Sequence, residues 1–215
     1  RIKAVNSLGI KYGDKVSFIT KTSDRDGNIY SVIAIGEQYW MGENLKTTRY
    51  NDGKPIPLVT EDSKWASLNT AAYCWYNNDI KYKPIYGALY NWYAVKTNKL
   101  CPVGWHVPTD EEWTVLTEYL GGKDVAGGKI KEAGTSHWAS PNTGASNESG
   151  FTAMPAGNRR YDGFFSGATG HATWRTSTEY DVNKVMYRYV FYHSSSLYST
   201  STNKNAGYSV RCIKD

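Results

Sequence analysis

The residues with the richest interaction chemistry gather near the C-terminus. Residues 180–203 contain five tyrosines, five serines and two asparagines. Tyrosine supplies rigid aromatic contact area at low entropic cost, and serine and asparagine supply adaptable hydrogen bonds, as in antibody paratopes. This composition predicts a ligand-binding surface. An aromatic β-surface that packs on the domain's own long loops is the alternative.

A predicted strand over residues 185–193 orders these rings, because successive side chains of a strand point to opposite faces. We expect the exposed face to carry Tyr187, Tyr189, Phe191 and His193. The opposite face carries Met186, Arg188, Val190 and Tyr192. This second face is the expected core face, since valine and methionine are the better core residues.

Carbohydrate binding uses similar residues, with a ring stacked on the apolar face of a sugar and polar groups holding the hydroxyls. Trp174 and Arg188 join the candidates on this basis. The complete set of candidate ligand-binding residues is Trp174, Tyr180, Asp181, Asn183, Tyr187, Tyr189, Phe191, His193, Tyr198, Thr200 and Asn203. Neither Glu-Pro-Asn nor Gln-Pro-Asp occurs, so calcium-dependent sugar binding is not supported. A glycan and a surface protein both stay open as ligands.

Catalytic and metal-binding motifs are missing from the sequence. The four histidines show no HExxH spacing, and there is no Gly-x-Ser-x-Gly or CxxC. Asp24-x-Asp26-Gly27-Asn28 imitates the start of a calcium loop, but its twelfth position is Ile35 instead of glutamate. A plain Asx turn is favoured there. Asp24 and Asp26 are thus weak candidates for structural calcium, and no other cofactor is expected.

Three cysteines predict one disulfide and one remaining thiol in an exported domain. The favoured pair is Cys101 and Cys212, which would close a loop of about 110 residues worth about 4–5 kcal/mol in the chain-entropy model. Cys74 is then left over. Reduced structural cysteines are the alternative.

Composition bounds the class of protein. The chain has 215 residues, 40% of them hydrophobic, 21% charged and 14% aromatic. That length fits one domain plus a fragment, and the composition is neither disordered nor membrane-like. The formal net charge is +5, but the basic residues are scattered, so no nucleic-acid partner is expected. No transmembrane segment or signal peptide is recognisable, which would place any export signal outside this sequence.

Local signals locate the main elements. Thr109 and Glu112 form a capping box that predicts a helix ending at Gly121-Gly122. A second short helix is expected over 125–132, interrupted by Gly127-Gly128. Strands are predicted over 29–36, 185–192, 197–202 and 208–213, the last three as an antiparallel meander. Residues 134–184 show no sustained period and predict a long irregular stretch.

The first 22 residues read differently from the rest. Residues 4–9 and 13–20 predict a strand end, a turn and a strand that alternates Val16, Phe18 and Thr20. This pattern resembles the last hairpin of a fibronectin type III-like module. Residues 1–22 are then the remnant of an upstream sandwich-type domain, and residues 23–215 are the main domain. An N-terminal hairpin of the main domain is the alternative.

A series of motifs runs in order through the main domain. They are Asp26-Gly27-Asn28-x-Tyr30, Ile35-Gly36-x-Gln38-x-Trp40-Met41-x-Glu43-Asn44-Leu45, Tyr50-Asn51-Asp52-Gly53, Tyr86-Gly87-x-Leu89-Tyr90-Asn91-Trp92-Tyr93-Ala94-Val95, Cys101-Pro102-x-Gly104-Trp105-His106-Val107-Pro108-Thr109-Asp110-x-Glu112-Trp113, Asn147-Glu148-Ser149-Gly150-Phe151 and Ser209-Val210-Arg211-Cys212. Over about 190 residues the chain resembles the Fibrobacter succinogenes major paralogous domain. The resemblance implies an exported or surface-anchored bacterial protein, often a lipoprotein, and thus an extracellular or outer-surface location.

The segment Gly104-Trp105-x-x-Pro108-Thr109-x-x-Glu112-Trp113 is also similar to a segment of formylglycine-generating enzymes and of variable proteins made by diversity-generating retroelements. Both have a C-type-lectin-like fold. This similarity implies an α+β, C-type-lectin-like domain with one main helix, a second short helix, small twisted antiparallel sheets and long ordered loops. In the variable proteins the C-terminal strands and loops bind the ligand. Residues 173–179 depart from the Trp-Trp-Ser-Ser-Thr-Glu run of many family members.

These observations predict a non-catalytic, exported domain that binds a glycan or a surface protein through its C-terminal strands and loops. A structural display module without its own ligand is one alternative. A degenerate enzyme related to formylglycine-generating enzymes is another, although the paired active-site cysteines of those enzymes have no convincing counterpart here.

Overall fold

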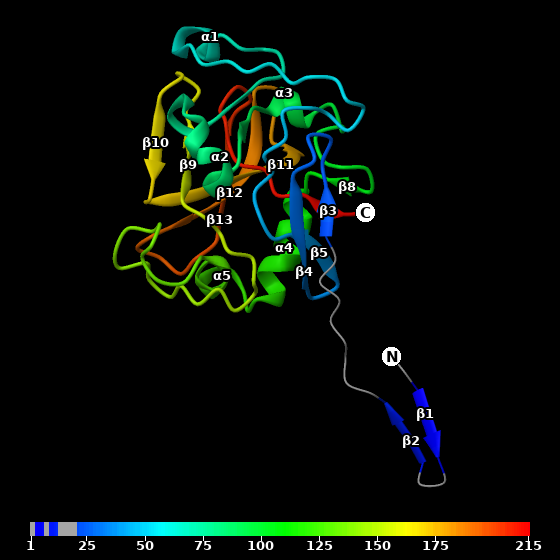
Figure 1. Cartoon of the computed structure of the whole chain (residues 1–215). Coiled ribbons are helices and arrows are strands. Elements are labelled where there is room, and N and C mark those ends of the chain that lie inside the picture. The colour runs from blue at the N-terminus through cyan, green and yellow to red at the C-terminus, as the bar shows by residue number, and fades with distance from the viewer. Residues whose placement is uncertain (1–2, 7–8, 13–20) are drawn as a thin grey trace.

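A computed structural model of the chain describes residues 3–6, 9–12 and 21–215 (Figure 1). Within this part the fold mixes helices and small curled sheets, and the α+β class is therefore confirmed. Strands β1 (Lys3–Asn6) and β2 (Gly9–Tyr12) form an antiparallel hairpin. The strand expected over residues 15–20 lies outside the described residues.

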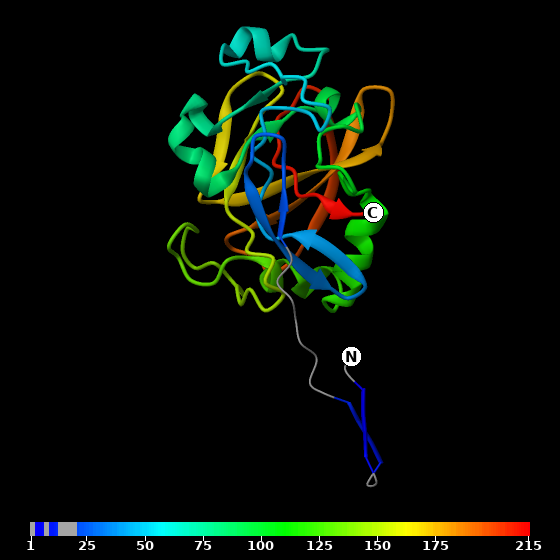
Figure 2. The same ribbon diagram turned by 45° about the vertical axis from the view of Figure 1, so that its right-hand side comes forward.

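One five-stranded sheet joins the two ends of the main domain, in the order β3-β4-β5-β14-β8. Its members are β3 (Lys21–Ser23), β4 (Ile29–Ile35), β5 (Gln38–Met41), β14 (Ile213–Lys214) and β8 (Trp105–His106). The strand predicted over 29–36 is β4, which pairs antiparallel with β5. Figure 2 shows the C-terminal β14 entering this N-terminal sheet, where Ile213 pairs with Trp40.

A second five-stranded sheet has the order β10-β9-β11-β12-β13. Its members are β9 (Ala156–Arg159), β10 (Phe165–Ala168), β11 (His171–Glu179), β12 (Lys184–Phe191) and β13 (Tyr198–Asn203). β12 and β13 confirm the strands predicted over 185–192 and 197–202. The prediction of a third meander strand over 208–213 was wrong. Residues 208 and 209 form isolated bridges with Tyr90 and Trp174, and β14 joins the other sheet.

The main helix, α4 (Asp110–Tyr119), is confirmed together with its capping box. The Thr109 hydroxyl accepts from the Glu112 N–H at 3.1 Å, and the Glu112 carboxylate accepts from the Thr109 N–H at 2.8 Å. The second helix is α5 (Lys123–Ile130). Gly127 and Gly128 lie inside this helix and do not interrupt it. A side chain at Gly127 would collide with the backbone of Ser195 and Ser196, so the glycines permit close packing.

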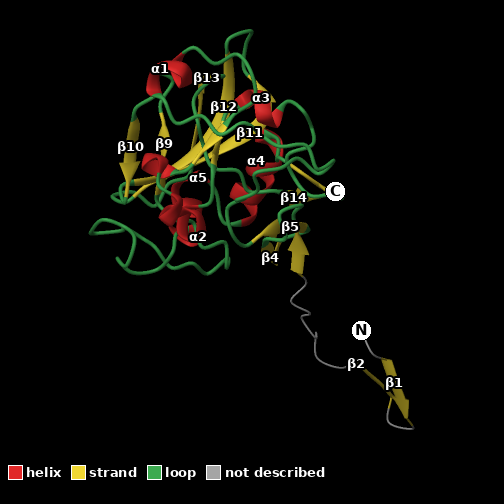
Figure 3. Cartoon of the chain, turned by 45° about the horizontal axis from the view of Figure 1, so that its top comes forward, coloured by secondary structure: helices red, strands yellow, loops and turns green. Residues whose placement is uncertain are grey.

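Short elements complete the chain. They are α1 (Asp62–Ala66), β6 (Tyr73–Cys74), the 3₁₀ turns η1 (Tyr76–Asn78) and η2 (Ile80–Tyr82), α2 (Lys83–Tyr86), β7 (Leu89–Tyr90) and α3 (Trp92–Val95). β6 pairs antiparallel with β7. Figure 3 shows that long loops, drawn in green, connect these elements.

The core is built largely from aromatic rings. Seven of the eight tryptophans are buried: Trp40, Trp65, Trp75, Trp92, Trp113, Trp138 and Trp174. Trp113 of α4 lies 4.9 Å from Trp40 of β5 and 5.4 Å from Trp174 of β11, measured between ring centroids. These rings connect the helix to both large sheets.

Buried cations hold the irregular segments. The guanidinium of Arg159 is fully buried between the rings of Trp65 and Phe165. It donates to the carbonyls of Gly163 at 2.7 Å, Val59 at 2.7 Å and Thr60 at 2.9 Å. A 2.8 Å ion pair with Asp62 completes its partners. One side chain therefore satisfies the backbone of two separate loops.

The predicted disulfide between Cys101 and Cys212 is confirmed. It ties the segment before α4 to the segment before β14. Cys74 is a buried free cysteine, and burial raises the pKa of its thiol to about 12. A thiol with so high a pKa is largely protonated near neutral pH and is a poor nucleophile. Among the described residues, no helix is long and apolar enough to cross a membrane.

The first prediction concerns the disulfide. Replacing both cysteines, Cys101→Ser and Cys212→Ser, should lower the free energy of unfolding by about 2–5 kcal/mol, because the bridge closes a long loop in the unfolded chain. Urea unfolding followed by tryptophan fluorescence measures this loss. Wild-type protein under strong reduction should approach the same midpoint. An unchanged midpoint in both samples would contradict the prediction.

The second prediction compares two neighbouring arginines. Arg159→Met should lower the free energy of unfolding by about 3–5 kcal/mol, because three carbonyls lose their buried donor and an ion pair is broken. Arg160→Met is the matched control, since Arg160 is half exposed and pairs with Asp162 on the surface. It should change stability by about 0.5 kcal/mol or less. Equal effects in thermal and urea unfolding would refute the structural role of Arg159.

Candidate ligand-binding surface

The register of β11, β12 and β13 brings most of the candidate rings onto one face. Tyr189 of β12 lies opposite Tyr198 of β13, and Tyr187 lies opposite Thr200. On the other side of β12, Phe191 lies opposite His171 of β11. The predicted alternation is confirmed for residues 187–191, because Arg188 and Val190 on the opposite face are buried.

The rings on this face contact one another in a continuous series, which we call the aromatic ladder: Tyr187, Tyr189, Phe191, His193 and Tyr198. Ring centroids are 5.3 Å apart for Tyr187 and Tyr189 and again 5.3 Å apart for Tyr189 and Phe191. Phe191 stacks on His193 at 5.1 Å, and Tyr189 stacks on Tyr198 at 5.1 Å. The ladder therefore forms one surface across β12, β13 and the turn between them.

The ladder is covered at one end and exposed at the other. Tyr187 stacks on Tyr208 with the rings 9° from parallel, and the buried guanidinium of Arg175 lies 4.5 Å from the Tyr208 ring centroid. Burial accordingly raises the pKa of the Tyr187 hydroxyl. Toward the other end, Tyr189, Phe191 and Tyr198 are half-buried and His193 is exposed. Thr200 is exposed too, but it lies opposite Tyr187. A ligand would meet the exposed end.

Lys131 fixes the turn that carries this exposed end. Its ammonium is buried and donates to the carbonyls of Thr143 at 2.9 Å, Phe191 at 3.1 Å and Ser194 at 2.9 Å. Burial lowers the pKa of Lys131 to about 8. Sequence reasoning counted Lys131 only as a scattered surface charge. A single lysine after a helix carries no pattern that marks it as buried.

Serines in the same turn set the position and the acidity of Tyr198. The Tyr198 hydroxyl lies 3.0 Å from the Ser194 hydroxyl. Hydrogen bonds from Ser194 and Ser196 lower the pKa of Tyr198. Lys123 of α5 adds a cation, with its ammonium 5.6 Å from the ring centroid. These neighbours therefore restrict the conformation of the Tyr198 side chain.

The remaining polar candidates lie at the far end of β12. Tyr180 is 64% exposed. Asp181 caps the β11–β12 turn by accepting from the Asn183 N–H at 2.7 Å and the Lys184 N–H at 2.8 Å. Asn183 and Asn203 line a shallow groove with Tyr93. These residues form a separate cluster and not an extension of the exposed ladder end.

Two sugar-binding candidates lie away from the surface. Trp174 is 0% exposed, and its indole N–H donates to Asn44 at 3.0 Å. The pleat of β11 turns Trp174 into the core beneath α4, so the expectation that it contacts ligand is corrected. Arg188 is buried too, and its guanidinium lies 2.7 Å from the Asp110 carboxylate at the start of α4. Both residues lie on the buried face of the sheet, where it packs against α4.

The weak calcium candidates are engaged in turns. One carboxylate oxygen of Asp24 accepts from the N–H groups of Asp26 and Asn28, both at 3.0 Å, and the other accepts from the Tyr30 hydroxyl at 2.5 Å. Asp26 accepts from the Thr48 N–H at 2.5 Å and the Thr48 hydroxyl at 2.8 Å. This is the favoured Asx turn. Within the described residues, no group of three or more His, Cys, Asp or Glu side chains could hold a metal ion.

Comparison with known proteins identifies the main domain. The family model described as "Fibrobacter succinogenes major domain" matches residues 33–214. No curated protein and no solved structure matched the chain. The structure adds residues 24–32 to the same unit, because Tyr30 is in the core and Asp26 holds Thr48. Since the match spans most of the 215 residues, the chain belongs to the Fibrobacter succinogenes major domain family.

Proposed function

We propose that this chain is a non-catalytic ligand-binding domain of an exported surface protein and that it binds through the exposed end of the aromatic ladder. The observation that carries the proposal is a set of half-exposed rings on a sheet whose other face is buried. The accessible residues at this end are Tyr189, Phe191, His193 and Tyr198. Export is supported by the Cys101–Cys212 disulfide, which persists in oxidising compartments.

Preorganisation favours binding at this surface. Ordering mobile side chains at an interface costs about 0.5–1.5 kcal/mol for each one. Here Tyr189 and Tyr198 are already stacked, and Lys131 already fixes the turn next to them. These side chains lose little additional conformational entropy when a partner binds, so less of the binding free energy of the ring contacts is offset.

The orientation of the rings favours a protein ligand over a glycan. A sugar stacks on the open face of a ring, and in the ladder one face of Tyr189 is taken by Tyr198 and one face of Phe191 by His193, which reduces the ring face available to a sugar. The groups that a ligand can contact include the ring edges, the tyrosine hydroxyls and the imidazole of His193. Paratopes bind proteins with this mixture of aromatic area and small hydrogen-bonding groups.

The C-type-lectin-like fold belongs to the same proposal. It is supported by two small curled sheets, by the pairing of β14 with β5 near the start of the domain, and by long loops of fixed conformation. A binding surface on the C-terminal strands is the arrangement that this similarity implies. The groove beside Asn183 and Asn203 is then a secondary contact region.

The third prediction tests the ladder with an array of defined oligosaccharides and purified surface proteins. Wild-type protein should capture at least one surface protein. Tyr189→Ala with Tyr198→Ala should weaken capture at least tenfold, because the accessible ring area is lost. The double variant should remain folded, with a stability loss of about 0.5–1.5 kcal/mol from the broken ring pair in addition to the loss of the buried part of both rings.

Tyr161→Ala is the matched control, since Tyr161 is half exposed on the β9–β10 turn, away from the ladder. It should leave capture unchanged. Tyr187→Ala should instead lower the melting temperature, because Tyr187 packs on Tyr208. Capture of oligosaccharides alone would refute the choice of a protein ligand. Absence of capture across the whole array would favour a structural display module.

A further inference from the structure

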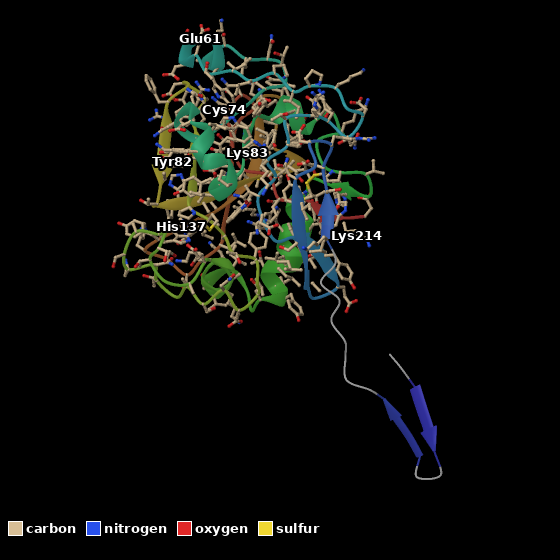
Figure 4. The ribbon with its side chains drawn as sticks, viewed as in Figure 1. Glu61, Cys74, Tyr82, Lys83, His137 and Lys214 are labelled. Carbon is tan, nitrogen blue, oxygen red and sulfur yellow. A yellow bond between two sulfur atoms is a disulfide. The ribbon has the colours of Figure 1, made fainter. Side chains whose placement is uncertain are left out.

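A cleft of about 310 Å³ lies on a different part of the main domain, between the segment after β5, helix α2 and the segments around residues 137 and 152. Lys83 of α2 and His137 of the loop after α5 both line it and are labelled in Figure 4. None of the ladder residues takes part. The volume is at the lower end of the range for small-molecule sites, which is about 300–1,000 Å³. The cleft therefore suits a compact ligand.

Arg211 lines this cleft and has an unused donor. Its guanidinium is fully buried and carries five N–H groups. Four hydrogen bonds engage it: Nε and one Nη2 hydrogen donate to Asn44, and Nη1 donates to the carbonyls of Gly42 and Phe151. One Nη2 hydrogen has no acceptor among the described residues. No carboxylate pairs with this buried cation there either, and burial lowers the pKa of Arg211 to about 9.

Asn44 lines the cleft beside Arg211 and offers a second unused donor. Its amide oxygen accepts from Trp174 and Arg211, which fixes the orientation of the amide. One amide hydrogen donates to the Tyr86 carbonyl at 3.0 Å. The second has no acceptor among the described residues. A buried donor without an acceptor costs about 1–3 kcal/mol, so an acceptor from a ligand would be favourable here.

Two lysines add positive charge around these donors. Lys46 and Lys83 line the cleft, are half-buried, and form no ion pair with a carboxylate in the described part of the chain. The Lys83 ammonium lies 5.6 Å from the centroid of the Trp75 ring, and the Lys46 ammonium lies 5.4 Å from the centroid of the Tyr30 ring. Glu43 is the acidic residue of the lining, but it is exposed and accepts from Ser31. The cleft therefore carries a positive excess.

Pro84, Ile85 and Met154 make part of the lining apolar. This wall would contact the carbon skeleton of a ligand whose charged group faces Arg211 and Asn44. A bare phosphate ion would gain nothing from such a wall. A neutral sugar would leave the lysines unpaired.

We propose that this cleft binds a compact organic carboxylate, with the carboxylate oxygens accepting from Arg211, Asn44 and the two lysines and the carbon skeleton resting on Ile85 and Met154. Hydrogen bonds between ionised groups are roughly twice as strong as neutral ones, and a carboxylate has lone pairs enough for all these donors. An acidic sugar and the C-terminal carboxylate of a peptide share this chemistry. The site is independent of the aromatic ladder.

The fourth prediction uses NMR titration of the whole chain with four probes: D-glucuronate, N-acetylalanine, D-glucose and inorganic phosphate. At least one of the two carboxylates should give saturable shifts that include the amides of Gly42 and Gly87. Glucose and phosphate should bind at least tenfold more weakly. The carboxylate that binds distinguishes an acidic sugar from a peptide terminus as the source.

Variants locate the binding. Lys46→Gln and Lys83→Gln should each raise Kd about tenfold, because each removes a charge-assisted hydrogen bond. Ile85→Glu should abolish binding by adding a negative charge to the wall. Lys96→Gln, at an exposed lysine outside the cleft, is the matched control and should not change Kd.

Two results would overturn the proposal. One is the absence of saturable shifts with either carboxylate while the spectrum remains that of a folded protein. The other is binding that both lysine variants leave unchanged, or that glucose or phosphate matches in affinity. The variant with Tyr189→Ala and Tyr198→Ala should bind the carboxylate normally, so a failure of the ladder proposal and a failure of the cleft proposal are separate outcomes.

Discussion

The fold depends on buried cations that bond to backbone carbonyls. Long loops leave many carbonyls without a partner in a helix or sheet, and a buried carbonyl without a donor is costly. Arg159 serves loops about one hundred residues apart in sequence, Lys131 serves three carbonyls around the β12–β13 turn, and Arg211 joins the segment after β5 to Phe151. Each cation is expensive to desolvate, so each must meet several acceptors at once. That requirement fixes the loops in one conformation.

The same constraint determines where the two candidate surfaces form. Arg211 and the disulfide of Cys212 hold the last segment against the first sheet, and the cleft forms beside the anchored guanidinium. Lys131 holds the turn after β12, and the exposed ladder end forms over it. Both candidate surfaces therefore rest on a buried cation. They differ in chemistry, because Lys131 uses its hydrogen bonds within the protein, whereas Arg211 keeps one donor without an acceptor in the described residues.

Local sequence signals predicted the elements that local interactions determine. The capping box of Thr109 and Glu112 located α4, and alternation located β12 and the faces of its rings. Strand β11 was not predicted from the sequence, because both of its faces are buried from Ala172 to Thr176. Burial on both faces removes the alternation of polar and apolar residues that marks a half-exposed strand. Trp174 was included among the ligand candidates because its ring could stack on a sugar, and no strand pattern showed that it points into the core. Lys131 and Arg211 were not recognised as anchors, since their acceptors are backbone carbonyls that no sequence motif displays.

The bonds that hold the turn after β12 in place are separate from the side chains that the proposed ligand would contact. The turn after β12 is fixed through the carbonyls of Phe191 and Ser194, and these acceptors are present whatever side chains the residues carry. Behind the sheet, Arg188 binds the first turn of α4 and Trp174 packs against Trp113. The side chains of Tyr189 and Tyr198 supply none of these bonds. Under the proposed function, the identity of these side chains can therefore follow the ligand while the backbone beneath them stays in place.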